Sequence, residues 1–173
     1  MIDVKFFFDA LQELNINNFS GVPDSLLKNI CSYISDNTSS TQHLISANEG
    51  SAVALAVGQY IATGKPSLVY MQNSGFGNTI NPLLSLADPK VYSIPMILMV
   101  GWRGEPGIKD EPQHIKQGAV MEQLLEACDI PFIIIDANTD NIKDILKSVV
   151  DKAVSNSQPL VLLVRKGTFK PYK

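Results

Sequence analysis

Apolar residues along the chain occur in two patterns. Short runs at 95–100 (PMILMV), 132–136 (FIIID) and 160–164 (LVLLV) show no polar alternation, which is typical of strands buried on both faces of a parallel sheet. Between such runs lie longer stretches whose apolar residues are spaced as in helices. The six predicted strands are Asn18–Val22, His43–Ala47, Leu68–Met71, Met96–Val100, Phe132–Ile135 and Leu160–Val164.

Helical stretches alternate with these strands. The predicted helices are Asp3–Leu14, Asp24–Ile34, Glu49–Thr63, Asn78–Ala87, His114–Ala127 and Thr139–Val154. Such alternation implies parallel βαβ units with right-handed crossovers. We therefore expect a single domain over residues 1–173, an α/β three-layer sandwich with a parallel sheet of about six strands. Asp24 is expected to cap the second helix.

Sheets of this kind bind ligands beyond the carboxyl ends of their strands. Four predicted loops follow strands and carry polar or glycine residues. They are 21–24 (GVPD), 48–50 (NEG), 72–77 (QNSGFG) and the long loop 101–113. We search these loops first for candidate chemistry.

Composition makes several function classes unexpected. The chain has 14 Lys and Arg against 17 Asp and Glu, a net charge of −3, and no basic stripe of the kind that nucleic-acid binders show. No apolar stretch reaches the ~20 residues that span a bilayer, and the first residues do not resemble a signal peptide. Cys31 and Cys128 lack metal-type spacing and are expected to be free thiols in a cytoplasmic protein.

The turn at 75–80 (GFGNTI) follows a strand and precedes a helix, as dinucleotide-binding loops do. Ile80 occupies the place of the third glycine of that motif, and no acidic residue follows the next strand, so a nicotinamide or flavin site is not expected. The chain also lacks a phosphate-binding P-loop, a nucleophile elbow and a His/Cys metal cluster. The turn either binds an anion or is only a tight connection.

Glu49 directly follows the predicted strand 43–47 and is flanked by small residues such as Gly50 and Ser51. A glutamate in the first turn of a helix often only complements the helix dipole. Packing among small residues would instead desolvate the carboxyl and raise its pKa toward a proton-donating value. Glu49 is therefore a candidate for catalysis.

The long loop contains charged residues that are candidates for a functional site, and each allows two interpretations. Arg103 and Lys109 either bind an anionic substrate group, Arg103 in bidentate fashion, or are solvated surface charges. His114 is a candidate for proton transfer or an ordinary surface histidine. Asp24 likewise either contributes to a site or only caps its helix.

Longer motifs in these loops resemble a known family. The segments 46–52 (SANEGSA) and 72–78 (QNSGFGN) resemble the pyrimidine-binding domain of thiamine diphosphate enzymes. The segments 21–28 (GVPDSLLK), 101–107 (GWRGEPG) and 110–114 (DEPQH) are similar to those of phosphonopyruvate decarboxylases, with sulfopyruvate decarboxylase α subunits as near relatives. The resemblance extends over nearly the whole chain.

The resemblance implies roles for individual residues. Glu49 matches the glutamate that hydrogen-bonds the cofactor's aminopyrimidine ring, and Asp24 and His114 are implied as catalytic residues on the substrate side. The implied cofactor-binding residues are Glu49, Asn73, Ser74, Gly75 and Phe76. The implied substrate-binding residues are Ser25, Arg103 and Lys109.

Members of this family hold the diphosphate and Mg²⁺ on a second domain through a Gly-Asp-Gly motif, which this chain lacks. The resemblance therefore implies half of an enzyme, inactive alone, that needs a diphosphate-binding domain of the same or a partner chain. Residues 165–173 (RKGTFKPYK) are expected to begin a linker, and a homo-oligomer is expected. The implied reaction converts 3-phosphonopyruvate to phosphonoacetaldehyde and CO₂. The alternatives are a sulfopyruvate decarboxylase α subunit and a non-catalytic α/β binding module.

Overall fold

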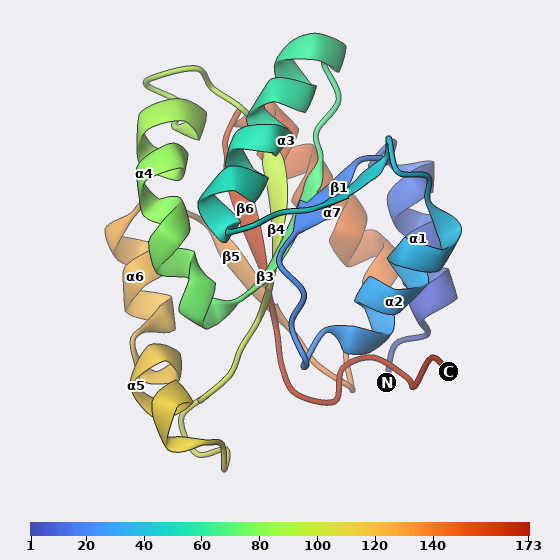
Figure 1. Ribbon diagram of the computed structural model, residues 1–173, viewed down its shortest axis with the longest axis vertical. Coiled ribbons are helices and arrows are strands. Elements are labelled where there is room, and N and C mark those ends of the chain that lie inside the picture. The colour runs from blue at the N-terminus through green and yellow to red at the C-terminus, as the bar shows by residue number, and fades with distance from the viewer.

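The computed structural model describes residues 1–173 and confirms the predicted three-layer α/β fold (Figure 1). Its six strands form one all-parallel sheet in the order β2-β1-β3-β4-β6-β5. The strands are β1 (Phe19–Gly21), β2 (His43–Ile45), β3 (Leu68–Gln72), β4 (Met96–Gly101), β5 (Phe132–Ile135) and β6 (Pro159–Val164). Because all strands are parallel, their carboxyl ends lie along one edge, the lower edge in Figure 1.

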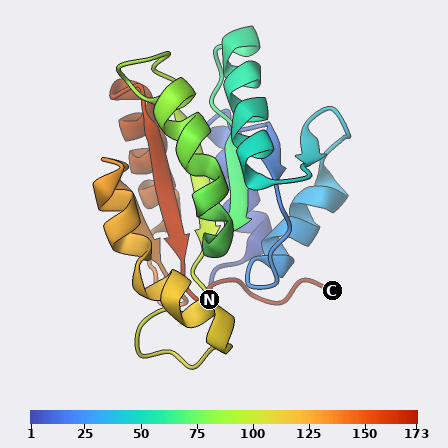
Figure 2. The same cartoon turned by 60° about the vertical axis from the view of Figure 1, so that its left-hand side comes forward.

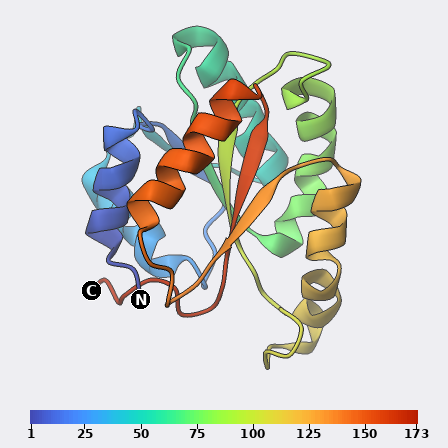
Figure 3. The same cartoon turned by 180° about the vertical axis from the view of Figure 1, so that it is seen from behind.

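Helices cover both faces of the sheet. One face is covered by α1 (Val4–Glu13), α2 (Lys28–Asn37) and α7 (Ile142–Ser155), which lie on the left-hand side of the sheet in Figure 3. The other face is covered by α3 (Glu49–Thr63), α4 (Ile80–Pro82) with its flanking turns, and α6 (Met121–Ala127), as Figure 2 shows.

The strands bury side chains on both faces, as their apolar runs predict. In β3, Leu68 and Tyr70 join the core beneath α1 and α2, whereas Val69 and Met71 join the core beneath α3. All residues of β4 and β6 are buried. Removing this apolar surface from water from both sides, at about 25 cal/mol per Å², is the main force that holds the three layers together.

The second helix differs from its predicted limits. It begins at Lys28 and ends at Asn37, where the sequence pattern predicts Asp24 and Ile34. The carboxylate of Asp24 accepts the N–H of Leu27 at 3.3 Å, which closes a turn in front of the helix instead of capping the helix itself. The prediction that Asp24 is the N-cap was therefore wrong, and the side chain stays at the carboxyl end of β1.

Helical structure after β3 begins earlier than predicted. A 3₁₀ segment (Asn73–Thr79) precedes the predicted start at Asn78, and a π-helical turn (Leu83–Ala87) completes the run after α4. The side chain of Asn73 exchanges two hydrogen bonds with the backbone of Arg103, at 2.9 and 3.0 Å. This contact between distant parts of the chain fixes the backbone as it leaves the strand, and a local pattern does not reveal it.

The predicted helix over residues 114–127 is two helices, α5 (Pro112–Ala119) and α6, which meet at Val120. At the break the indole N–H of Trp102 donates to the carbonyl of Gly118 at 3.0 Å. This bond ties the end of α5 to the start of the long loop. The break lets α5 extend past the lower edge of the sheet (Figure 1).

Residues 165–173 pack against the domain. Phe169 forms a parallel bridge with Ile2 and is buried against Phe7, with the two rings edge to face and 5.0 Å apart. Both termini lie at the lower edge of the sheet in Figure 1. The segment that the sequence suggested as a linker is therefore held against the domain over the residues that the structure describes.

Two smaller points concern thiols and membranes. Cys31 is buried and Cys128 partly buried, and both are free thiols, as predicted. Burial raises the pKa of the Cys31 thiol to about 12.

None of the helices combines the length and the apolar character that crossing a bilayer requires.

Candidate active site

Glu49 is the first residue of α3 and directly follows the loop after β2. Asn48 caps this helix, since its side chain accepts the N–H of Ser51 at 2.9 Å. The carboxylate of Glu49 accepts a hydrogen bond from the side-chain amide of Asn78 at 2.7 Å. Glu49 is half-buried, so the predicted poorly solvated setting is only partly formed within this chain.

Gly75 provides the space that the Glu49 carboxylate occupies. A Cβ atom at Gly75 would lie 2.2 Å from Glu49 Oε1 and 2.3 Å from its Cδ. Such a distance is far inside van der Waals contact, so residue 75 must be glycine for Glu49 to keep this position. The glycine turn thus positions the carboxylate that the sequence identified.

The other residues of the turn have different surroundings. The side chain of Asn73 is buried and engaged with the Arg103 backbone, and Phe76 lies in the core beneath α3. Ser74 is exposed and accepts a hydrogen bond from the Gln72 amide at 2.5 Å. Among these predicted cofactor-binding residues, Asn73 and Phe76 therefore shape the turn, and Ser74 is exposed with its hydroxyl bound to Gln72.

Asp24 is the second carboxylate at this edge and is 5 % exposed. Its Oδ2 would lie 2.2 Å from a Cβ atom at Gly101, so a glycine again makes room for a carboxylate. Its Oδ1 is buried without a hydrogen-bond partner. Burial raises the pKa of Asp24, and this effect outweighs hydrogen bonds from two backbone N–H groups and the nearby positive charge of Arg103.

Arg103, at the start of the long loop, is held by a carboxylate that the sequence analysis did not pair with it. Its Nε and Nη2 donate to the two oxygens of Asp110, at 2.8 and 2.5 Å, and its Nη1 donates to Ser25 Oγ at 3.0 Å. The guanidinium holds the pKa of the Asp110 carboxyl well below its usual range. Two predicted substrate residues, Arg103 and Ser25, are therefore in direct contact, whereas Lys109 is exposed without an ion pair.

His114 lies in the first turn of α5, at the end of the same loop. Its Nδ1 is 3.5 Å from the side-chain nitrogen of Gln72, the last residue of β3. Arg103 and His114 both lie close enough to Asp24 for a positive charge on either to favour its ionised form. The fold therefore places His114 with Asp24 and Arg103, although no single stretch of sequence links the three.

A family model described as "Thiamine pyrophosphate enzyme, N-terminal TPP binding domain" matches residues 4–126. The chain belongs to this family. Among solved structures, benzoylformate decarboxylase from Polynucleobacter necessarius superposes with a TM-score of 0.67 at 21% identity, over 96% of this chain and 30% of that one. At this identity the superposition supports the pyrimidine-domain fold alone.

Curated relatives of this thiamine pyrophosphate enzyme domain are more similar in sequence. The domain is 36% identical to phosphonopyruvate decarboxylase of Streptomyces viridochromogenes over 142 residues. This stretch makes up 82% of this chain and 35% of that protein. The domain is also 35% identical over 125 residues to the sulfopyruvate decarboxylase subunit alpha of Methanocaldococcus jannaschii, which covers 72% of this chain and 70% of that subunit. The domain thus spans about a third of the first relative and most of the second.

The residues of the thiamine pyrophosphate enzyme domain fit the pyrimidine end of the cofactor. The Glu49 carboxylate lies over Gly75, where any side chain would displace it, and its Oε2 accepts the side-chain amide of Asn78, which leaves Oε1 for a hydrogen bond to a pyrimidine ring. The domain contains no group of three or more His, Cys, Asp and Glu side chains arranged to hold a metal ion.

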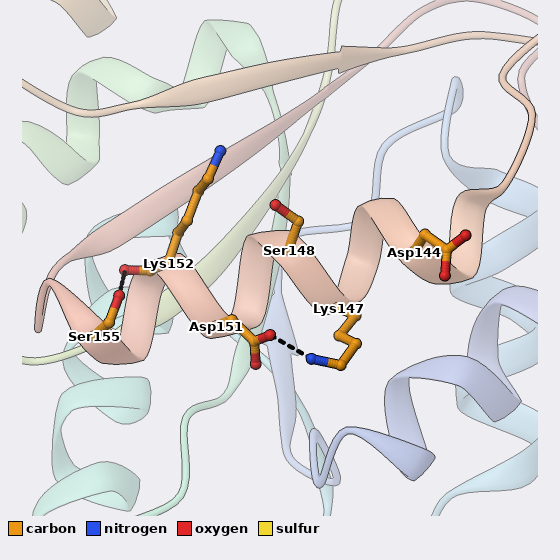
Figure 4. A pocket seen from close by; sticks show the side chains of 6 residues that line it. All are labelled: Asp144, Lys147, Ser148, Asp151, Lys152 and Ser155. Carbon is orange, nitrogen blue, oxygen red and sulfur yellow. Dashed lines mark hydrogen bonds and ion pairs between the residues drawn. The ribbon is translucent and has the colours of Figure 1, made fainter.

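A hollow elsewhere on the domain has no comparable chemistry. It lies along the outer side of α7, and Figure 4 shows that all six lining side chains come from that helix. Its charges are partly paired, with Lys147 and Asp151 in contact at 2.6 Å. Because no second element contributes to it, we do not regard this hollow as a site.

Replacing Gly118 by alanine tests how the long loop is anchored in this thiamine pyrophosphate enzyme domain. The new Cβ atom would lie 1.9 Å from the carbonyl oxygen of Gly104, which is backbone that cannot turn aside. We expect the free energy of unfolding to fall by about 1–3 kcal/mol, measured by chemical denaturation. The matched control is Gly58→Ala in α3, where nothing lies near the new Cβ atom and a gain of about 0.5–1 kcal/mol is expected. Equal effects at the two glycines would contradict the anchor.

Proposed function

We propose that this domain is the pyrimidine-binding half of a thiamine diphosphate-dependent 2-oxo acid decarboxylase that converts 3-phosphonopyruvate to phosphonoacetaldehyde and CO₂. The observation that carries the proposal is the Glu49 carboxylate, oriented by Asn78 above Gly75 at the carboxyl edge of the sheet. The 36% identity to a phosphonopyruvate decarboxylase supports the choice of substrate.

Thiamine diphosphate supplies an electron sink for the cleavage of the bond to the substrate's carboxylate group. Glu49 would hydrogen-bond the ring nitrogen of the cofactor's pyrimidine and hold a proton there. The hydrogen bond from Asn78 fixes one carboxylate oxygen and leaves the other free for this contact. A preset orientation of this kind avoids the cost of ordering the side chain during the reaction.

Asp24 would act on the substrate side. A buried carboxyl whose pKa is raised holds a proton more readily than an exposed one, and can therefore donate it. Its unpartnered Oδ1 is an atom on which that proton would reside. His114 provides a second proton-carrying group near Asp24, and Arg103 and Ser25 provide donors for an anionic group.

The diphosphate and Mg²⁺ would be bound by a second domain, in the same chain or a partner chain, that faces the carboxyl edge. The proposal predicts that this chain is inactive without that domain and that the assembled enzyme is at least a dimer. A sulfopyruvate decarboxylase α subunit is the second candidate function. It is favoured by one observation, the match to 70% of a separate subunit.

The test is release of aldehyde and CO₂ by this chain assembled with its diphosphate-binding domain, thiamine diphosphate and Mg²⁺. The substrates are 3-phosphonopyruvate, sulfopyruvate and pyruvate, assayed in parallel. Preferred turnover of phosphonopyruvate supports the proposal. Preference for sulfopyruvate supports the second candidate, and absence of turnover with all three refutes both.

A further inference from the structure

A cavity of about 340 Å³ opens at the carboxyl edge between the β1–α2 loop and the segment after β6. It is separate from the turn that holds Glu49. Its polar lining consists of Ser25, Lys28, Asn29, Arg103 and Lys166. The segments that supply these residues follow β1, β4 and β6, and in Figure 1 the chain after β6 runs beneath the start of α2.

The lining carries three cations and no carboxylate. Lys28 and Lys166 take part in none of the ion pairs of the domain. Arg103 is neutralised by Asp110 on one side, but its Nη1 faces the cavity residue Ser25 at 3.0 Å. Like charges directed at one hollow repel each other, and a bound anion would relieve that repulsion.

The donors also suit a particular kind of anion. Two ammonium groups, one guanidinium N–H, a hydroxyl and an amide can together satisfy three oxygens that carry more than one negative charge. Lys28 is in addition the first residue of α2, where free backbone N–H groups favour negative charge. The cavity shares Ser25 and Arg103 with the candidate active site, and Ser25 is adjacent to Asp24 in the chain.

We propose that this cavity binds the phosphonate end of the substrate, and that Lys28 and Lys166 determine the preference for a substrate with this group. The inference rests on the proposed function and extends it to residues that the sequence analysis did not single out. Lys28 and Lys166, which line the cavity, take the role that the sequence assigned to Lys109, which does not line it. A sulfonate carries one charge and a phosphonate nearly two, so two lysines without ion pairs favour phosphonate.

The test uses the assembled enzyme with Lys28→Ala, Lys166→Ala and the double variant. The value of kcat/KM for 3-phosphonopyruvate is expected to fall roughly tenfold for each lysine, the scale of one charge-assisted hydrogen bond. The value for pyruvate, which lacks the anionic end, is expected to stay unchanged. Competitive inhibition by methylphosphonate is expected to weaken in parallel. Lys90→Ala, an exposed lysine in the loop before β4, is the matched control and should change neither substrate.

Each outcome has one meaning. A loss confined to phosphonopyruvate supports the cavity as the phosphonate subsite. Equal losses with phosphonopyruvate and pyruvate overturn it, because they indicate damage to the fold or the assembly. Unchanged kinetics in all variants also overturn it but leave the proposed function standing. If the unmodified enzyme turns over neither substrate, the proposed function itself fails, and this inference fails with it.

Discussion

Replacing Glu49 by glutamine is expected to lower the turnover of 3-phosphonopyruvate by the assembled enzyme roughly 100- to 10,000-fold, the range that positioned acid–base groups contribute. Glutamine keeps the size of the side chain and can still accept the hydrogen bond from Asn78. It cannot hold and release a proton at the cofactor's ring nitrogen. Steady-state release of aldehyde and CO₂, with saturating cofactor, measures the loss.

The control for this prediction is Glu122→Gln. Glu122 also lies in the first turn of a helix, α6, so its substitution removes the same favourable contact with a helix dipole. Turnover should stay within about twofold of the unmodified enzyme, since the contact of a side-chain charge with a helix end has a small effect. If Glu49→Gln behaves like this control, Glu49 only complements its helix, and the non-catalytic binding module becomes the better description.

Replacing Asp24 by asparagine is expected to reduce turnover roughly 100-fold or more while the folded domain becomes more stable at neutral pH. Burial raises the pKa of Asp24 above its ordinary value of 3.8. The folded state therefore binds the proton more tightly than the unfolded state. The stabilisation from this proton is complete below pH 3.8. It is lost as the pH rises from 3.8 through the raised pKa of the folded state.

Ionising Asp24 as the pH rises creates a buried charge without a full set of partners, and asparagine removes that cost. The free energy of unfolding, from chemical denaturation at pH 4 and pH 7, should rise in Asp24→Asn at pH 7 and change less at pH 4. Asp140→Asn, at an exposed position, should alter neither stability nor turnover. Lower stability of Asp24→Asn at pH 7 would contradict a raised pKa.

The sheet could be predicted from the sequence because its strands are apolar on both faces. The runs at 96–100 and 160–164 predict β4 and β6 to within one residue. Helix starts were predicted less well wherever a polar side chain bonds outside its helix. Asp24 closes a turn and Asn73 holds the Arg103 backbone, and neither use leaves a local signal.

The candidate site could be predicted from the sequence only where its residues lie in local motifs. Glu49 and Gly75 are recognisable because each lies at a loop after a strand and in a motif. The pairing of Arg103 with Asp110 depends on how the long loop folds back, and the cavity with Lys28 and Lys166 depends on three loops meeting in space. A lysine after a strand looks the same in sequence whether it faces solvent or a cavity.

The bridge between Ile2 and Phe169 places both ends of the chain at the edge of the sheet that carries the candidate site. A polypeptide joined to either end would therefore start close to that edge. A second domain fused to this chain would thus begin at the same edge that a separate subunit would have to face. One relative is about three times as long as the part that matches this chain, and another is a separate subunit. Both arrangements are compatible with this domain geometry. Splitting or joining such genes would need little change inside the domain.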